Sequence, residues 1–340
     1  MKLYGAIDLH STNSMTVLID EQDNVVYRKR LPNDLKLILE QLAPYRSRIE
    51  GIVVESTYNW YWLVDGLMEQ GHRVHLANTA AIQQYNGLKY TDDDSDARWL
   101  AHLLRLGVLP EGYIYPKQER AVRDLLRKRS QLVRQRTVNL LSIQNLYTRN
   151  SGSSLSANQI KGLQVEDIEG NVAASDLALA IKANFAVMQC ADEQVEILEQ
   201  TVTERVKLRP QFSFLKTVPG IGRVLALTIM LETGDIRRFR SVGNFASYCR
   251  CVGSQKISNG KRKGSGNTKN GNKYLSWAFV EAANFAIRFS AKIKSFYQRK
   301  KAKSKGVVAI KAVAHKLCRA CYYIMRDRVA FNVTKAFGQN

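Results

Sequence analysis

The sequence contains few of the features that mark secreted or membrane proteins. Its 340 residues include five cysteines and six prolines, and a low, odd cysteine count does not fit a disulfide framework. No run of about 18 uncharged apolar residues is present, so no membrane span is predicted. Asp8 follows the start too closely for a secretory signal peptide. We therefore expect a cytoplasmic protein with no membrane partner.

Acidic residues are almost absent from the C-terminal third of the chain. Residues 237–340 contain 24 Lys and Arg but only Glu281 and Asp327, whereas residues 1–236 contain 27 basic and 28 acidic residues. The formal net charge of +21 therefore comes from the last third. Such a surface suits a polyanion, most often nucleic acid, so we expect association with the nucleoid.

Three domains are predicted from the hydrophobic pattern. Hydrophobic residues make up 45% of the chain, enough for packed cores. Residues 1–112 have the order βββαβαβα, which predicts an α/β domain whose first three strands form an antiparallel meander. The predicted strands are Leu3–Leu9, Ser14–Asp20, Val25–Arg30, Gly51–Glu55 and Arg73–Ala77, and the helices are Asp34–Leu42, Tyr58–Gln70 and Ser95–Leu106.

A helical middle region is predicted over residues 113–208, and Pro110 and Pro116 mark its boundary with the first domain. Apolar residues recur at helical spacing over 117–149 and 174–206, which predicts two long helices joined by a polar loop, as an antiparallel hairpin or coiled coil. Residues 117–149 carry nine basic and two acidic residues. Three cations here are candidate nucleic-acid contacts: Arg127, Lys128 and Arg134.

Residues 209–340 predict a mainly helical, basic third domain. Helices are expected over 274–297 and 307–330, and residues 254–273 are expected to form a loop. The turn Pro219–Gly222 is typical of a helix-hairpin-helix, in which the amides of Gly220 and Gly222 approach a phosphate. Further candidate phosphate contacts are the cations of the basic loop and of the residue after it: Lys256, Lys261, Arg262, Lys263, Lys269 and Lys273.

Four carboxylates are candidates for a metal site. Asp8 and Glu55 end two apolar strands, and Asp93 and Asp96 share one face if a helix has begun by Asp93. Carboxylates that converge repel one another unless cations hold them, and oxygen ligands suit Mg²⁺ or Mn²⁺. Two such ions assist in-line attack on a phosphodiester. Asp93 or Asp94 could instead cap the helix.

The order of strands and carboxylates resembles the RNase H-like fold of RuvC-type Holliday-junction resolvases. An actin-like or sugar-kinase ATPase also begins with an aspartate on a first hairpin. Such ATPases need small residues or glycine directly after that aspartate, so that the phosphates can approach. Asp8 is followed by Leu-His-Ser-Thr-Asn, which disfavours that alternative.

Several motifs in order resemble the DEDD transposases of bacterial insertion sequences, which are bridge-RNA-guided recombinases related to Piv-type DNA invertases. The likeness covers essentially the whole chain, and the ordered set is specific although each motif alone is weak. The motifs are Gly5-Ala-Ile-Asp8, Val53-Val-Glu55-Ser-Thr, Asp93-Asp-Ser-Asp96-Ala-Arg-Trp-Leu-Ala101, Val218-Pro-Gly-Ile-Gly222, Gly234-Asp-Ile-Arg-Arg-Phe239, Phe245-Ala-Ser-Tyr248, Ser258-Asn-Gly260 and Lys269-Asn-Gly271-Asn272.

The resemblance implies a chemistry and a set of partners. Asp8, Glu55, Asp93 and Asp96 match the metal-binding tetrad, and Ser258 matches a nucleophile that forms a 5′-phosphoserine intermediate. Ser258-Asn-Gly260 stands where the family has Ser-Gly-Gly, and the nearby Ser254 and Ser265 are alternative nucleophiles. The family recombines donor and target DNA, is guided by a structured noncoding bridge RNA, and assembles as dimers and tetramers.

Two other functions remain open from the sequence. A RuvC-like resolvase or nuclease would use the same carboxylates with water in place of the serine. A non-catalytic nucleic-acid-binding protein would keep the fold and the basic surface without the chemistry. Chemistry alone does not favour a serine nucleophile, because none of the five histidines lies near Ser258 in sequence to act as its base.

Overall fold

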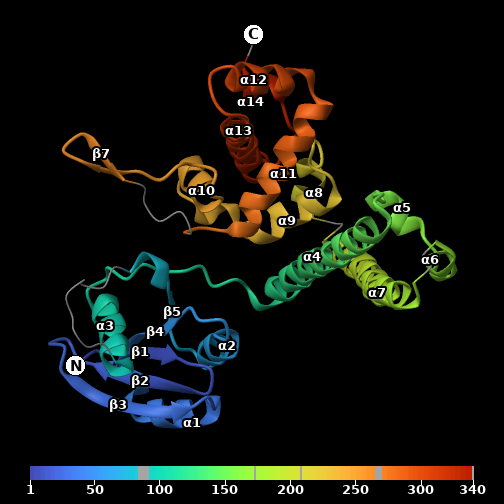
Figure 1. Cartoon of the computed structure of the whole chain (residues 1–340). Helices are drawn as coiled ribbons and strands as arrows, with labels where there is room; N and C mark the ends of the chain where they lie inside the picture. Colours follow the sequence, from blue (N-terminus) through green and yellow to red (C-terminus); the bar gives the residue numbers. More distant parts are fainter. Residues whose placement is uncertain (83–91, 172–173, 207–208, 265–269, 339–340) are drawn as a thin grey trace. The chain divides into compact units, whose positions relative to one another are not determined.

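The computed structural model describes residues 1–82, 92–171, 174–206, 209–264 and 270–338 (Figure 1). The chain divides into two compact units, Met1–Lys117 and Gln118–Asn340. No helix in the described ranges combines the length and the apolar character that a membrane span requires.

The first unit is built on a five-stranded sheet in the order β3-β2-β1-β4-β5. Strands β1, β2 and β3 form an antiparallel meander, and β4 and β5 run parallel to β1. This confirms the predicted meander and the predicted order of elements. The elements are β1 (Leu3–Leu9), β2 (Asn13–Ile19), β3 (Val25–Pro32), α1 (Leu35–Leu42), β4 (Ile49–Glu55), α2 (Tyr61–Glu69), β5 (Val74–Ala77) and α3 (Asp93–Arg105), with short 3₁₀ turns at Ala43–Arg48 and Thr79–Ala81.

Helices cover both faces of this sheet. Helix α3 packs on one face, where Ala6 of β1, Met15 of β2 and Val53 of β4 meet Ala97 and Leu100 of α3. Helices α1 and α2 pack on the other face, over a separate buried cluster. Because both faces are covered, the central strands are apolar along most of their length, and a polar side chain at a strand end stands out.

Two long helices dominate the first part of the second unit. Ion pairs join Arg129 to Glu199, at 2.7 Å, and Arg136 to Asp192, which confirms that α4 and α7 run antiparallel. The connection predicted as a polar loop instead contains two short helices, which share a buried core with the ends of the long pair. These elements are α4 (Lys117–Ser151), α5 (Ala157–Gly162), α6 (Val165–Asn171) and α7 (Ser175–Val206).

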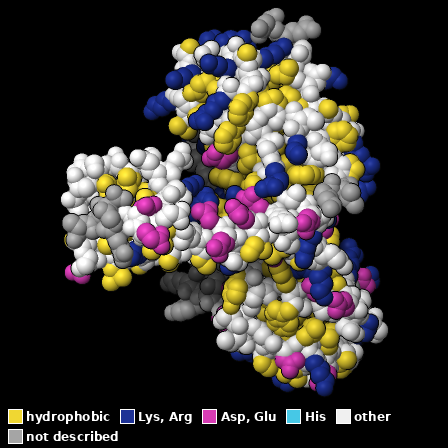
Figure 2. Space-filling view, turned by 90° about the vertical axis from the view of Figure 1, so that its right-hand side faces the viewer, with side chains coloured by type: hydrophobic (Ala, Val, Ile, Leu, Met, Phe, Trp, Pro, Cys, Tyr) yellow, Lys and Arg dark blue, Asp and Glu magenta, His cyan; other side chains and the backbone are white. Residues whose placement is uncertain are grey.

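The rest of the second unit is a helical bundle around one core. Cys249, Cys318 and Cys321 are fully buried in it, as expected for cysteines on apolar helix faces. Figure 2 shows many Lys and Arg side chains over its C-terminal helices, at the top of the view. The elements are α8 (Pro210–Leu215), α9 (Arg223–Thr233), a 3₁₀ turn (Ile236–Arg238), α10 (Val242–Tyr248), β6 (Lys256–Ser258), β7 (Lys261–Gly264), α11 (Lys273–Phe289), α12 (Ala291–Lys301), α13 (Gly306–Asp327) and α14 (Val333–Phe337).

Two predictions for this unit are wrong. The helix predicted over 274–297 is broken at Ser290, which leaves the helical region at φ −133° and caps α12 through a hydrogen bond from the Ile293 amide at 3.4 Å. The loop predicted over 254–273 contains the hairpin β6–β7, with Asn259 and Gly260 at its turn. Both turn residues have positive φ, 50° and 68°, as a two-residue hairpin turn requires.

Candidate active site

The register of the parallel strands brings Asp8 and Glu55 together. Ile7 of β1 pairs with Val54 of β4, so the next residues, Asp8 and Glu55, stand side by side at the C-terminal ends of both strands. Asp8 is 3% exposed. This end of an α/β sheet is where ligand sites commonly form, because side chains from neighbouring strands converge there.

The carboxyl groups of Asp8 and Glu55 are close enough to share a proton. A hydrogen bond to Asp8, partial burial, and the charges of Asp8 and Asp96 raise the pKa of Glu55 to about 8. Two neighbouring carboxylates repel when both are ionised, so Glu55 keeps its proton near neutral pH. A bound cation would replace that proton and favour the ionised form of both groups.

The third and fourth carboxylates lie in the first turn of α3. Asp92, rather than Asp93 or Asp94, is the N-cap, and it forms a reciprocal capping box with Ser95. The helix therefore begins at Asp93, which places Asp93 and Asp96 one turn apart. The charge of Asp96 contributes to the raised pKa of Glu55, whereas the tight group of possible ligand atoms comprises Asp8 and Asp93 with His10 and contains neither Glu55 nor Asp96.

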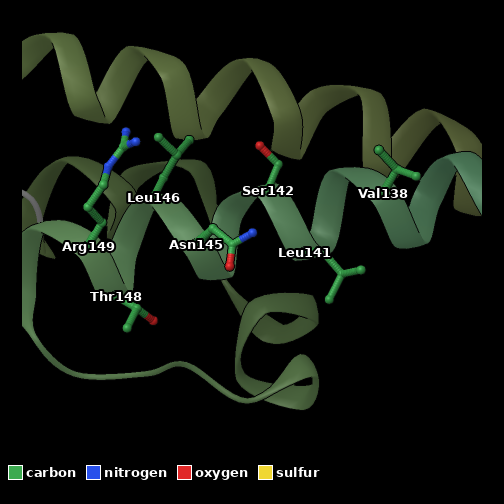
Figure 3. A pocket seen from close by; sticks show the side chains of 7 residues that line it. All are labelled: Val138, Leu141, Ser142, Asn145, Leu146, Thr148 and Arg149. Carbon is green, nitrogen blue, oxygen red and sulfur yellow. The ribbon is translucent and has the colours of Figure 1, made fainter.

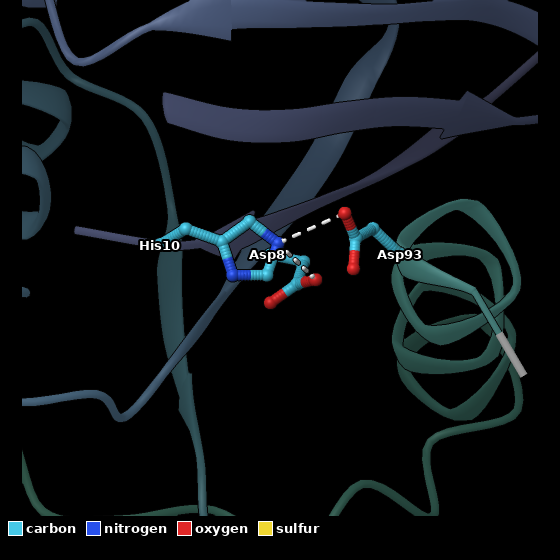
Figure 4. A group of neighbouring side chains, drawn as sticks. All are labelled: Asp8, His10 and Asp93. Carbon is cyan, nitrogen blue, oxygen red and sulfur yellow. Dashed lines mark ion pairs between the residues drawn. The ribbon is translucent and has the colours of Figure 1, made fainter. Parts of the chain in front are cut away.

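His10 lies at the centre of this group and was not predicted. Figure 4 shows one of its ring nitrogens facing both carboxylates, with Nε2 at 3.3 Å from the Asp8 carboxylate and 3.2 Å from that of Asp93. Its backbone carbonyl accepts hydrogen bonds from the side-chain amides of Asn33 and Asn59, each at 3.0 Å. The sequence signal was its position two residues after Asp8, which puts both side chains on one side of an extended chain.

Two arginines of β3 also reach the start of α3. Arg30 pairs with Met15 across β2–β3, and Met15 pairs with Asp8 across β1–β2, so all three side chains project from one face. The Arg30 guanidinium lies 2.5 Å from the Asp93 carboxylate. With His10 it lowers the pKa of Asp93. Arg28, two residues earlier, pairs with Asp94 at 3.1 Å.

The donor set at this end of the sheet fits a hard divalent cation. Asp8, His10 and Asp93 each offer one ligand atom, and these atoms all lie within 4.8 Å of one another. Carboxylate oxygens such as those of Asp8 and Asp93 suit Mg²⁺ or Mn²⁺, whereas an imidazole nitrogen is more typical of ions such as Zn²⁺. In the described ranges this is the one group of at least three such residues at that spacing, so the cysteines of the second unit do not form another.

Ser258 ends β6, directly before the hairpin turn. Its pairing partner across the turn is Lys261, and both side chains are exposed. The turn thus presents the Ser258 hydroxyl at the tip of a cationic hairpin. Ser254 lies at the root of the hairpin and Ser265 lies outside the described residues.

Two segments of the chain match known transposase families. Residues 6–149 match the DEDD transposase model of the IS110 type, described as "Transposase", and residues 213–298 match "Transposase IS116/IS110/IS902 family". The chain belongs to the IS110 family of transposases. Among relatives, a "Probable family 20 transposase" of Pseudomonas aeruginosa is 23% identical over 92% of this chain and 94% of its own. An "Insertion element IS110 uncharacterized 43.6 kDa protein" of Streptomyces coelicolor is 22% identical over 44% of this chain and 38% of its own.

The predicted DNA contacts of this transposase differ in their surroundings. Lys128, Arg134, Lys261, Lys263 and Lys273 are exposed, whereas the guanidinium of Arg127 lies 2.6 and 2.7 Å from the two carboxylate oxygens of buried Glu232. Lys269 lies outside the described residues, as do the side chains of Lys256 and Arg262.

The two glycines of the predicted helix-hairpin-helix differ in how closely other residues pack around them. At Gly220, with φ +85°, a Cβ atom would lie 2.5 Å from backbone atoms of Ala282 and Ala286 on α11. Packing on α11 therefore explains this glycine, and a phosphate contact through it stays a prediction. Gly222 has open space around its Cα.

An open pocket along α4 lacks the groups that catalysis needs. Its volume is about 670 Å³, and all of its lining residues come from one helix (Figure 3): Val138, Leu141, Ser142, Asn145, Leu146, Thr148 and Arg149. Among the lining residues that the structure describes, Arg149 alone is charged, so they offer no acid–base pair. The carboxylate cluster of the first unit remains the candidate active site.

Proposed function

We propose that this transposase cuts and rejoins DNA strands with a magnesium- or manganese-dependent carboxylate site and a serine nucleophile. The hydrogen-bonded Asp8–Glu55 pair at the strand ends carries the metal part of the proposal, because such a pair is unfavourable unless a proton or a cation is shared. The strand order of the first unit supports an RNase H-like, RuvC-type fold for it.

Asp8, Glu55, Asp93 and Asp96 would hold the metal, and Nε2 of His10, at 3.3 Å from Asp8 and 3.2 Å from Asp93, would offer a further ligand atom. A divalent ion would supply positive charge to the phosphate oxygens and to the leaving oxygen. Arg30 holds Asp93 ionised through its ion pair. These residues fix the charges before the DNA arrives, which lowers the reorganisation needed during the reaction.

Ser258 is the proposed nucleophile. Its Oγ would form a bond to the phosphorus while the bond from phosphorus to the 3′ oxygen breaks. The serine proton leaves to a base or to solvent, and the 3′ oxygen becomes a hydroxyl. The product is a 5′-phosphoserine linkage, which a 3′ hydroxyl of another strand can later attack to rejoin DNA. Exposure at a hairpin tip supports this role, because a strand can approach without displacing core residues.

The partners proposed are donor DNA, target DNA, a structured noncoding bridge RNA and further copies of the chain. Net positive charge of residues 237–340 supports binding of polyanions. Val138 and Leu141 of α4 are 66% and 49% exposed, and exposed apolar residues at helical spacing support dimers or tetramers formed through the long helices.

One experiment tests the chemistry. Purified protein is mixed with end-labelled DNA, Mg²⁺ and the noncoding RNA transcribed beside its gene, and protein linked to a DNA 5′ end is sought on denaturing gels. The proposal expects an adduct that disappears in Ser258→Ala and persists in Ser254→Ala. Free cleaved ends that persist in Ser258→Ala would instead establish a nuclease that uses water. RNA binding without any cleavage would establish a binding protein.

A further inference from the structure

A polar cleft lies at the root of the β6–β7 hairpin, which we call the serine hairpin because Ser258 lies at its tip. The residues that line this cleft are distinct from the predicted DNA contacts. Its volume is about 640 Å³, within the range of roughly 300–1,000 Å³ typical of ligand sites. It is lined by the end of α10, the segment leading into β6, the start of α11 and one residue of α13. The residues that matter are Tyr248, Arg250, Ser254, Asn270, Gly271 and Lys311.

The two ends of the serine segment are fastened together at this cleft. Arg250 donates to the Gly271 carbonyl from Nε at 3.1 Å and from Nη2 at 2.8 Å. The Asn272 amide donates to the Tyr248 carbonyl at 2.6 Å. A Cβ at Gly271 would lie 2.5 Å from that carbonyl oxygen. The two chain segments that lead into and out of the hairpin therefore approach each other too closely for any residue but glycine at position 271.

Arg250 is held in a strained conformation. Its φ of 55° lies in the left-handed region, which a residue with a side chain adopts only at a cost of roughly 1–2 kcal/mol. Its two hydrogen bonds to Gly271 fix the guanidinium at the cleft wall. This conformation ends α10 as a Schellman motif, because the Arg250 amide donates to the Ser247 carbonyl and the Cys251 amide donates to the Ala246 carbonyl, each at 2.9 Å.

The Ser254 hydroxyl lacks a partner inside the cleft. Its Oγ is buried and makes no hydrogen bond in the described ranges. A buried polar atom without a partner costs about 1–3 kcal/mol, and a ligand that accepts or donates a hydrogen bond there removes this cost. Hydrogen bonding to a ligand therefore explains a serine at position 254 without a nucleophilic role.

The charge of the cleft selects an anion. Arg250 and Lys311 supply two cations, and no Asp or Glu is among the described lining residues. Lys311 is exposed on α13 and has no ion-pair partner in the described part of the chain. A guanidinium, an ammonium and hydroxyls around an open polar cleft match the oxygens of a phosphodiester.

The geometry points to a binding site for a backbone phosphate of the DNA strand on which the serine hairpin acts, formed by Arg250, Lys311 and the Ser254 hydroxyl. Only the identity of the strand rests on the proposed function. DNA is favoured over RNA because the cleft is at the base of the element that carries Ser258. A phosphate held there would fix the strand relative to the hairpin, so that the neighbouring linkage reaches its tip.

Binding of a fluorescent single-stranded DNA, followed by anisotropy between 50 and 300 mM salt, tests the site. The full chain is used with Ser258→Ala, so that no covalent product forms and binding is read without chemistry. Lys311→Met should reduce the slope of log affinity against log salt by about 0.7, the loss of one phosphate contact on a single strand. Ser254→Ala should weaken binding roughly three- to tenfold and leave the slope unchanged.

Lys316→Met is the matched control on the same helix, because its ammonium lies 5.8 Å from the centre of the Phe296 ring, away from the cleft residues. It removes the same charge and should leave the slope nearly unchanged. Equal slope losses for Lys311→Met and Lys316→Met would show diffuse attraction and overturn the site. An effect on an RNA strand but not on the DNA strand would overturn the assignment to DNA. Absence of a serine adduct in the unmodified protein would reject the proposed chemistry alone, because the slope difference is measured without it.

Discussion

Glu55 at the end of β4 hydrogen-bonds to Asp8 at the end of β1, and the parallel register of these strands holds the two carboxyl groups on the face covered by α3. In the metal-free protein this neighbourhood raises the pKa of Glu55 to about 8, so near neutral pH the ionised form of the pair is disfavoured. The site is therefore arranged for a cation at some cost to the stability of the unit that carries it.

Replacing Glu55 with glutamine should separate stability from activity. Loss of an outer-shell partner of a metal costs about 10- to 100-fold, so loss of a ligand should reduce DNA cleavage by more than about 100-fold. The melting temperature without metal should stay nearly the same, because Glu55 already holds its proton near neutral pH and an amide can also donate a hydrogen bond to Asp8. Glu50→Gln is the control: Glu50 lies on the same strand and pairs with Lys2 at 3.3 Å, so cleavage should be unchanged. Equal cleavage by both variants would remove Glu55 from the site.

Arg30→Gln should tighten binding of Mg²⁺. Its guanidinium lies 2.5 Å from the Asp93 carboxylate and is half exposed, so it competes with a cation through a partly screened charge worth about 1 kcal/mol. The Mg²⁺ concentration for half-maximal thermal stabilisation should fall roughly fivefold. Arg28→Gln removes an arginine from the same strand face, but its partner is Asp94, outside the predicted tetrad. An equal shift in Arg28→Gln would assign the effect to general charge.

Arg127 should contribute to stability rather than to DNA binding. Its partner Glu232 is 1% exposed and also accepts a hydrogen bond from Asn272 at 2.7 Å. Arg127→Ala leaves a buried carboxylate with one partner fewer, which should lower the free energy of unfolding in urea by about 3 kcal/mol. Lys128→Ala, one residue along, changes an exposed side chain and should alter stability by less than about 0.5 kcal/mol. A stable Arg127→Ala that loses DNA affinity would restore the original prediction.

The two acids at the strand ends of the candidate site could be predicted from the sequence, whereas the histidine and the arginine beside them could not. Asp8 and Glu55 interrupt apolar runs, and an acid in that position is visible without a structure. His10 and Arg30 reach the site through pairing across two antiparallel strands, from Asp8 to Met15 to Arg30, and a one-residue shift in register would have sent Arg30 to the other face.

The errors in the helical region have local causes. The break at Ser290 lacks glycine or proline, and the apolar pattern continues through it, so only the cap hydrogen bond to Ile293 reveals it. The hairpin at Asn259-Gly260 could have been predicted, because this dipeptide is a strong signal for a two-residue turn. It was missed because the many glycines and cations around it are typical of a loop.

Asp23 should make the first unit sensitive to acid. Partial burial raises the pKa of Asp23, but hydrogen bonds from Arg105 and His102 outweigh this and lower it below its usual value of 3.8. A lowered pKa means that the folded state gains stability from this carboxylate above that pH and loses it as the pH falls below. The melting temperature of Asp23→Asn should therefore lie below that of the parent at pH 7 and approach it as the pH falls from 3.8 through the lowered pKa of Asp23. Glu21→Gln is the neighbouring control. A gap for Asp23→Asn that stays constant with pH would contradict this account.

The turn of the serine hairpin should control adduct formation without affecting the core. Gly260 has φ +68° and nothing within 4 Å of its missing Cβ, so Gly260→Ala adds backbone strain but no clash. Strain of roughly 1–2 kcal/mol should lower the yield of serine–DNA adduct roughly five- to thirtyfold, while the melting temperature stays the same because the hairpin is exposed. Asn259→Gly keeps a residue suited to positive φ and should leave the yield within about twofold. If Gly260→Ala reacts as well as Asn259→Gly, the turn does not position Ser258, and a serine outside the hairpin tip must be considered as the nucleophile.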